Sequence, residues 1–165
     1  MYFEPFVAYI PKGHKLHTKN KIKTDELVIE DMLLLEDGHC FRDGVINLCK
    51  AFKNHEEDKF QLESGSIETL IKLSNEGLGM TLLPYLHTLD LNTSAKENLH
   101  YFEEPAPARE VSIIYHKSEL KMQIIEAMQS VISGIIRGAI KFQDVKIISL
   151  YPNKKATLGS LFLWF

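Results

Sequence analysis

Two cysteines, Cys40 and Cys49, are the only ones in the 165-residue chain, and both lie in the stretch GHCFRDGVINLC. A thiolate is the form of cysteine that attacks oxidants and binds metals, so a close pair could form a disulfide, hold a metal or react with peroxide. Two cysteines are too few for the disulfide framework of a small secreted protein. In a reducing compartment, such a pair favours redox or metal chemistry over a structural bridge.

The residues that follow Cys40 predict an amphipathic helix. Its apolar side chains fall at offsets of 0, 4, 7, 8 and 11 positions, at Phe41, Val45, Leu48, Cys49 and Phe52. Nine residues of intact helix rise ~13.5 Å and turn the two thiols to opposite faces. A disulfide joins Cα atoms only ~4.4–6.8 Å apart. The intact helix and a bond between the cysteines therefore exclude each other.

The surroundings of the two thiols differ. Cys40 lies at the predicted helix N-terminus, whose partial positive charge favours the thiolate. His39 and Arg42 add a possible donor and a cation, while Asp43 suits the first turn of a helix. Cys49 lies on the apolar face and is expected to be protected. This asymmetry suits an attacking and a resolving cysteine.

Other interpretations of these residues stay open at this point. Cys49 alone fits simple packing in a core. A zinc site from His39, Cys40, Cys49 and His55 is a further alternative, although it lacks the usual Cys-x₂₋₄-Cys spacing. The Gly-x-Gly at Gly77 precedes a predicted strand rather than a helix, which is the wrong order for a dinucleotide site.

Composition limits the class of protein. The chain is 45% hydrophobic and 25% charged, which is typical of a globular protein of one domain or two small lobes. Its net charge of −3 argues against tight DNA binding by this chain. No apolar run reaches the ~18 residues of a membrane span, and no secretion signal is evident. We therefore expect a cytoplasmic protein without membrane contact.

Alternation of strands and helices predicts α/β layers around a largely parallel sheet. Expected strands are 6–10, 31–36, 60–63, 78–83, 99–102 and 111–115. Expected helices are 41–52, 67–76 after a Ser64 or Ser66 cap, a helical turn within 85–93, and a long helix capped by Ser118 that carries Ile124 to Ile136. Residues 12–23 predict a loop, and 105–107 an extended spacer.

The stretch LLLEDGHCFRDGVINLC, residues 33–49, closely resembles the redox segment of the peroxide-sensing LysR-type transcriptional regulators. In that family a leucine-rich strand leads into Glu-Asp-Gly-His-Cys-x-Arg-Asp, and a second cysteine follows nine positions after the first. SIETLIKLSNEGLGMTLLP is similar to the family's helix, Gly-x-Gly and Leu-Pro, and PAPAREVSIIYH to the strand that returns to the first lobe.

The resemblance implies a fold of two Rossmann-like lobes similar to periplasmic binding proteins, one lobe essentially complete and the other partial. On that map, residues 1–11 are a crossover strand of the partial lobe I. Residues 12–110 form lobe II with the cysteines, and residues 111–150 are the C-terminal part of lobe I. Residues 151–165 form an apolar tail that does not resemble the family.

The resemblance also implies a redox-sensing regulatory domain rather than an enzyme. Hydrogen peroxide would oxidise Cys40, Cys49 would resolve it as a disulfide, and His39, Arg42, Asp43 and Arg109 would surround the thiolate or the peroxide. No cofactor and no metal are implied. The intact regulator would be a homodimer or tetramer and would bind DNA only through a winged helix-turn-helix domain absent from this chain.

Two further functions remain as alternatives. One is a LysR-type effector domain that binds a small-molecule inducer without redox chemistry. The other is a thiol peroxidase, against which the sequence argues. It has neither Cys-x-x-Cys nor Pro-x-x-x-Thr-x-x-Cys leading to Cys40.

Overall fold

The computed structural model describes residues 2–37, 40–50, 62–116, 118, 121–140 and 145–147, with the side chains of 40, 50 and 145–147 left out. The strands are β1 (Tyr2–Tyr9), β2 (Lys21–Ile22), β3 (Leu34–Leu35), β4 (Glu63–Ser64), β5 (Thr81–Pro84), β6 (Leu99–Phe102), β7 (Ala106–Val111) and β8 (Val145–Ile147). The α-helices are α1 (Cys40–Lys50), α2 (Ile67–Asn75), α3 (Tyr85–Leu89), α4 (Thr93–Lys96) and α5 (Met122–Ala139). Two short 3₁₀ helices are Thr24–Glu26 and Ile29–Asp31.

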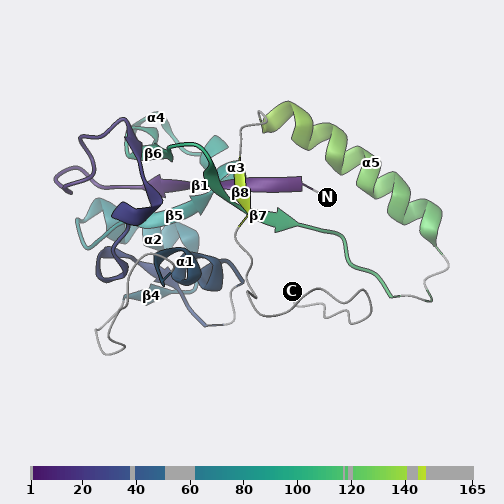
Figure 1. Ribbon diagram of the computed structural model, residues 1–165, viewed down its shortest axis with the longest axis horizontal. Helices are drawn as coiled ribbons and strands as arrows, with labels where there is room; N and C mark the ends of the chain where they lie inside the picture. The colour runs from purple at the N-terminus through teal and green to yellow at the C-terminus, as the bar shows by residue number, and fades with distance from the viewer. Residues whose placement is uncertain are drawn as a thin grey trace.

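Strand β1 is the centre of the main sheet, whose order is β2-β6-β1-β7-β8 with β5 also paired to β1. Its two halves have different partners. Residues 2–5 pair with β7, whereas residues 6–9 pair with β5 and, at Ala8 and Tyr9, with β6. One strand therefore connects two regions of the molecule (Figure 1).

The expectation of a largely parallel sheet holds, among the described residues, only for the strand pairings that do not involve β1. The pairings of β1 with β5, β6 and β7 are all antiparallel. Parallel pairing is found for β2 with β6, β3 with β4 and β7 with β8. The reason is topological, because β1 runs against the strands on both its sides.

The strand predicted at 111–115 is also wrong, since β7 ends at Val111 and residues 112–116 have no regular structure. A β-branched sequence forms a strand only where a neighbour supplies hydrogen bonds. Val111 pairs with Tyr2, the first residue of β1, so the ladder ends there. The predicted spacer at 105–107 instead provides the start of β7.

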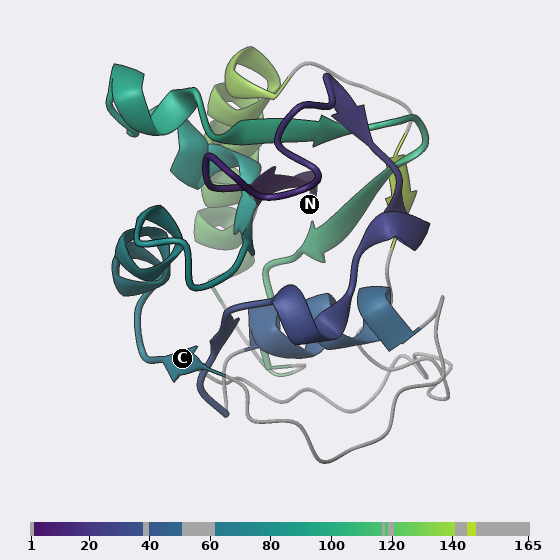
Figure 2. The same ribbon diagram turned by 90° about the vertical axis from the view of Figure 1, so that its left-hand side faces the viewer.

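Helix α1 confirms the predicted amphipathic pattern. Phe41, Val45, Leu48 and Cys49 are buried in the largest apolar cluster of the described residues, together with Phe6 of β1. Figure 2 shows α1 on one side of strands β1 and β7. The helix is therefore held by the apolar contacts that its sequence pattern predicts.

Helix α2 begins and ends as its sequence predicts. The Ser66 hydroxyl accepts a hydrogen bond from the Thr69 amide, and Gly77 follows the helix with a positive φ of 80°. Gly79 has a φ of 155°, and a Cβ at this position would lie 2.7 Å from the Asp31 carbonyl oxygen. Only glycine permits this close approach of the chain before β5 to the segment before β3.

Helix α5 extends to Ala139 despite Gly134 and Gly138, as expected. The predicted Ser118 cap is wrong, because Lys121 is the N-cap residue and makes no side-chain capping bond. The apolar side chains of one face of α5 remain 51–67% exposed, and they are Ile124, Met128, Val131 and Ile135. Figure 1 shows the helix apart from the sheet that contains β1.

The remaining expected elements are found with altered bounds. The strand expected at 31–36 is reduced to β3 after a 3₁₀ turn, and the strand expected at 60–63 is β4. The strand expected at 78–83 is β5, and the one at 99–102 is β6 with the same bounds. The predicted loop at 12–23 contains β2, which pairs with β6.

Candidate functional site

Helix α1 places the two cysteines at opposite ends of one continuous helix. It begins at Cys40 and ends at Lys50, one residue after Cys49. A rise of ~13.5 Å over nine residues is about twice the longest ordinary Cα separation of a disulfide. Cys49 is fully buried on the apolar face. The structure therefore contains the intact form of the element that a disulfide would have to disrupt.

Arg42 anchors the first turn of α1 to two carboxylates. Its guanidinium lies 3.0 Å from Asp37, in the turn before the helix, and 2.6 Å from Glu63 of β4. The hydrogen bond to Glu63, with the charges of Glu63, Asp37 and Asp43, raises the pKa of Arg42 against the opposing effect of partial burial. The Arg42 Nε is buried and has no hydrogen-bond partner among the described residues. Arg42 thus fastens α1 to β4.

Arg109 of β7 lies opposite Glu4 of β1 in the antiparallel ladder. Its Nε and Nη2 donate to Glu4 Oε2 at 3.0 and 2.8 Å. Glu4 is 1% exposed, and its other oxygen accepts a hydrogen bond from the Leu86 amide of α3 at 3.0 Å. A buried carboxylate requires such partners, because an unpaired charge in an apolar interior is very costly.

Phe41 connects this ion pair to the helix that begins at Cys40. The Arg109 guanidinium carbon lies 5.2 Å from the centre of the Phe41 ring, within the range of a cation–π contact. The Phe41 ring also packs on Phe6, with ring centres 5.1 Å apart. Contacts therefore run from Glu4 through Arg109 to the residue next to Cys40.

The predicted site residues are only partly within the described residues. Arg42, Asp43 and Cys49 lie on α1, with Asp43 exposed in the first turn, and Arg109 contacts the same turn through Phe41. His39 and the Cys40 side chain lie outside the described residues, as does His55 of the zinc alternative. Among the residues that are described, no group of three His, Cys, Asp or Glu side chains could hold a metal ion.

Sequence reasoning did not identify Glu4, Phe41 or Glu63 as parts of this cluster. For Glu4 a signal was present in the sequence. It is the lone carboxylate in the apolar run YFEPFVAY, and a carboxylate in a buried strand requires a cationic partner. Phe41 was assigned to the core but not to Arg109. No signal in the sequence identified Glu63 as a partner for Arg42, because the two residues are far apart in the chain.

Comparison with known proteins assigns the family. A family model for the LysR substrate binding domain matches residues 1–132. The chain belongs to the LysR substrate-binding domain family. Within the part of the chain that the structure describes, no helix is both long and apolar enough to cross a bilayer.

Relatives of this LysR domain include a probable hydrogen peroxide-inducible genes activator of Mycobacterium leprae. It is 27% identical over 136 residues, which are 82% of this chain and 43% of that protein. The HTH-type transcriptional regulator EstR of Acinetobacter baylyi is 33% identical over 110 residues, 64% of this chain and 35% of that protein. The chain therefore spans less than half the length of these regulators.

Among solved structures, reduced OxyR from Porphyromonas gingivalis superimposes with a TM-score of 0.70 at 28% identity, covering 88% of this chain and 67% of that one. This similarity confirms the predicted fold class of α/β, periplasmic-binding-protein-like lobes. Coverage of two thirds of that chain agrees with one essentially complete lobe and a partial one.

Proposed function

We propose that this LysR domain is the redox-sensing regulatory domain of a peroxide-responsive transcriptional regulator. Reversible formation of a Cys40–Cys49 disulfide would be its switch. The observation that carries the proposal is the continuity of α1 from Cys40 to Lys50, with Cys49 buried. Support comes from relatives named as hydrogen peroxide-inducible genes activators.

The proposed chemistry has two steps. The Cys40 thiolate attacks one oxygen of hydrogen peroxide, the O–O bond breaks, and hydroxide leaves and takes up a proton to become water. Cys40 is then a sulfenic acid. The Cys49 sulfur attacks the Cys40 sulfur, the S–O bond breaks and a second water leaves. Two thiols and one peroxide thus give one disulfide and two waters, and thiol reductants reverse the change.

The disulfide step requires motion of α1, because its intact length keeps the two thiols apart. Unwinding would release Phe41 from Arg109 and would withdraw Cys49 from the core. Helix α1 is therefore the bistable element that oxidation would bias.

The roles of the neighbouring polar residues form part of the proposal. Arg109 and His39 would stabilise the Cys40 thiolate or polarise bound peroxide, and Arg42 would hold the first turn of α1 in place. Asp43 would act through the helix N-terminus. For Arg109, the support is its contact with Phe41, the residue that follows Cys40.

The proposed arrangement of the chain assigns residues 1–11 and 111–150 to lobe I and residues 12–110 to lobe II. The pairing of β1 with β7 supports this assignment, because these two strands would be the crossovers. The intact regulator would act as a homodimer or tetramer in the cytoplasm and would bind DNA through a separate winged helix-turn-helix domain. The apolar stretch 151–165 lies outside the described residues.

Thiol counting tests the proposal. The reduced full chain is treated with one equivalent of hydrogen peroxide, and thiols, mass and far-UV circular dichroism are compared before and after. We expect loss of both thiols, an intramolecular disulfide and a loss of helix signal. Cys49→Ser should stop at a sulfenic acid that dimedone traps, and Cys40→Ser should keep its thiol. Survival of both thiols in the parent chain, or the same oxidised product in Cys49→Ser, contradicts the proposal.

An inducer-binding domain without redox chemistry is the second candidate function. It is favoured by the similarity to EstR, whose name mentions no peroxide. A small anion that raises the melting temperature of the chain, together with thiols that are indifferent to peroxide, would select this candidate over the redox switch.

A further inference from the structure

Histidine rings hold the loop that joins β1 to β2, residues 10–20, against strand β6. The His17 ring of the loop lies 3.3 Å from the side-chain oxygen of Asn98, just before β6. The His100 ring of β6 lies 2.8 Å from the backbone carbonyl oxygen of His17. The two rings meet edge to face, with their centres 5.0 Å apart. None of these residues belongs to the cysteine site.

The other side-chain contacts of the loop are insensitive to pH near neutrality. Lys12 pairs with Glu97 and Lys15 pairs with Asp31, each at 2.8 Å, and both lysines are exposed. The Leu16 side chain is buried in the core. Lysines and carboxylates keep their charges between about pH 5.5 and 8, whereas histidines change theirs in this range.

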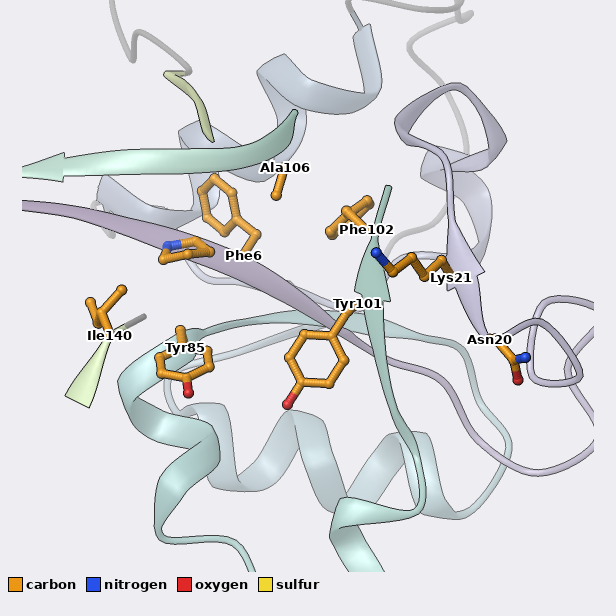
Figure 3. Close-up of a pocket in the computed structure, with 9 residues that line it drawn as sticks. Phe6, Asn20, Lys21, Tyr85, Tyr101, Phe102, Ala106 and Ile140 are labelled. Carbon is orange, nitrogen blue, oxygen red and sulfur yellow. The ribbon is translucent and has the colours of Figure 1, made fainter. Parts of the chain in front are cut away.

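The loop passes at its end into β2, a strand of two residues that pairs in parallel with β6. Figure 3 shows Asn20 and Lys21, where the loop enters β2, beside Tyr101 and Phe102 of β6. The Asn20 side chain points away from these rings in that view. So short a ladder constrains the loop weakly, and the histidine contacts therefore matter for its position.

The hydrogen bonds of Asn98 decide which His17 nitrogen carries a proton. The Asn98 amide nitrogen donates to the Tyr9 hydroxyl at 3.3 Å and to Asn75 Oδ1 at 3.2 Å. The side-chain oxygen of Asn98 is therefore the acceptor that faces His17. Because an oxygen of this kind only accepts, His17 Nε2 must carry the hydrogen.

The His100 ring has a carbonyl oxygen at each of its nitrogens. Nε2 lies 2.8 Å from the His17 carbonyl oxygen, and Nδ1 lies 3.1 Å from the Asn98 carbonyl oxygen. A neutral imidazole has one N–H, so one of its nitrogens would direct a lone pair at a carbonyl oxygen. An imidazolium donates to both. His100 is 6% exposed, so water has little access to replace a lost partner.

The charges around His100 leave the two carbonyl groups as its main partners. The titratable or charged groups on the elements next to this ring are His17 and Lys12 of the loop, Glu97 before β6, Tyr9 of β1 and Lys21 of β2. Lys12 and Glu97 pair with each other. A charge on His17 would repel a charge on His100, so we expect His100 alone to hold the first proton.

We propose that His100 is a proton-operated latch for the β1–β2 loop. With a hydrogen on each nitrogen, the ring ties the loop through the His17 carbonyl and its own strand through the Asn98 carbonyl. Loss of one proton to solvent turns one hydrogen bond into a contact between lone pairs, and the loop opens more often. The latch is independent of the proposed cysteine chemistry, so either can fail without the other.

His14, the other histidine of the loop, has the opposite requirement. Its Nδ1 accepts a hydrogen bond from the Leu16 amide at 3.2 Å, and its Nε2 lies 3.5 Å from Asp31 Oδ2. A neutral ring satisfies both contacts, and a proton on Nδ1 would displace the Leu16 amide. His14 is therefore a control on the same loop.

Hydrogen exchange of loop amides tests the latch in the full reduced chain. The His17 and Lys19 amides, which donate to carbonyl groups within the loop, are followed at about pH 5.5 and about pH 8. Rates are expressed as protection factors, which removes the intrinsic effect of pH. We expect loop protection to fall about three- to tenfold at the higher pH, as for loss of one hydrogen bond. The Met80 amide, in the core, is the internal reference.

Variants assign the pH dependence to one ring. His100→Gln has no proton to lose in this range, so its loop protection should change less than about twofold between the two pH values. His14→Gln should keep the dependence of the parent. His116→Gln, the same change at an exposed histidine, should also behave as the parent does.

Nitrogen NMR of the parent chain provides a readout that needs no variant. The two imidazole nitrogens of His100 should both carry hydrogen at about pH 5.5, and one of them should lose it as the pH rises. Three results would each overturn the proposal. They are loop protection that is independent of pH in the parent, parent-like pH dependence in His100→Gln, and a single N–H on His100 at the lower pH.

Discussion

At the scale of single residues, the pair of Glu4 and Arg109 shows how a buried charge is accommodated. The Glu4 carboxylate, on β1, is bound by two other elements. Arg109 of β7 donates two hydrogen bonds to it, and the Leu86 amide of α3 donates one. Removing one partner of a buried pair leaves the other charge without compensation, which costs more than the pair contributes to stability.

We expect Glu4→Ala to lower the free energy of unfolding by about 2–4 kcal/mol, because it strands Arg109 and the Leu86 amide. Urea denaturation of the reduced chain measures the change. Glu97→Ala is the matched control, since Glu97 pairs with Lys12 at an exposed site. It should change stability by less than about 1 kcal/mol. Equal effects of the two substitutions would contradict the buried-pair argument.

Asp31 provides a pH-dependent contribution. Burial acts to raise its pKa, but the Lys15 hydrogen bond and charge, together with His14, lower it below the ordinary value. A lowered folded-state pKa stabilises the fold above the unfolded value of about 3.9, and this stability is lost as pH falls through the folded value. Lys15 lies 2.8 Å from Asp31.

Lys15→Gln should therefore raise the pKa of Asp31 and move the acid-unfolding midpoint to higher pH. Carboxyl-carbon NMR titration follows the first quantity, and circular dichroism follows the second. In Lys72→Gln, which changes an exposed lysine of α2, the Asp31 titration should match the parent. A parent-like titration in Lys15→Gln would show that the ion pair does not set this pKa.

At the scale of elements, the local sequence pattern predicts a helix correctly where the helix buries one apolar face. The apolar spacing of α1 and the Ser66 and Gly77 boundaries of α2 were predictable, because each depends on contacts within a few residues. The end of β7 at Val111 was not, since it depends on where β1 begins. In the site, α1 and its cysteines were predictable, whereas partners distant in sequence, such as Glu63 for Arg42, required the fold.

Two glycines test how local geometry sets stability. Gly79→Ala should destabilise the chain by about 1–3 kcal/mol, because its φ of 155° and the 2.7 Å approach to Asp31 exclude a Cβ. Gly134→Ala in α5 should instead stabilise the helix by about 0.5–1 kcal/mol, because nothing lies within 4 Å of the added methyl group. Thermal melts followed by far-UV circular dichroism distinguish the two signs. A stabilising Gly79→Ala would refute the steric argument.

At the scale of the whole molecule, helix α5 has an apolar face that the other described residues leave exposed. An apolar face on a helix normally packs against another element. Here Val131 and Ile135 are 61% and 67% exposed. This chain covers 67% of the reduced OxyR chain from P. gingivalis, so about a third of that chain has no counterpart in the superposition.

This exposure predicts that the chain binds the hydrophobic dye ANS in its native state. The double variant Val131→Asp/Ile135→Asp should lower the dye fluorescence by more than half while the far-UV spectrum is retained. Gln129→Asp/Ser130→Asp, at exposed polar positions of the same helix, is the control and should leave the fluorescence near that of the parent. Equal fluorescence in both double variants would show that the dye binds elsewhere.

The divided pairing of β1 has a consequence for the accuracy of folding. Its first half is aligned by β7 and its second half by β5 and β6, so neither ladder can slide without the other. A slip of one residue would turn Glu4 toward the opposite surface of the strand and bring a neighbour that cannot bind Arg109 into its place. The ion pair between Glu4 and Arg109 therefore forms only when β1 is in the correct register with the strands on both of its sides.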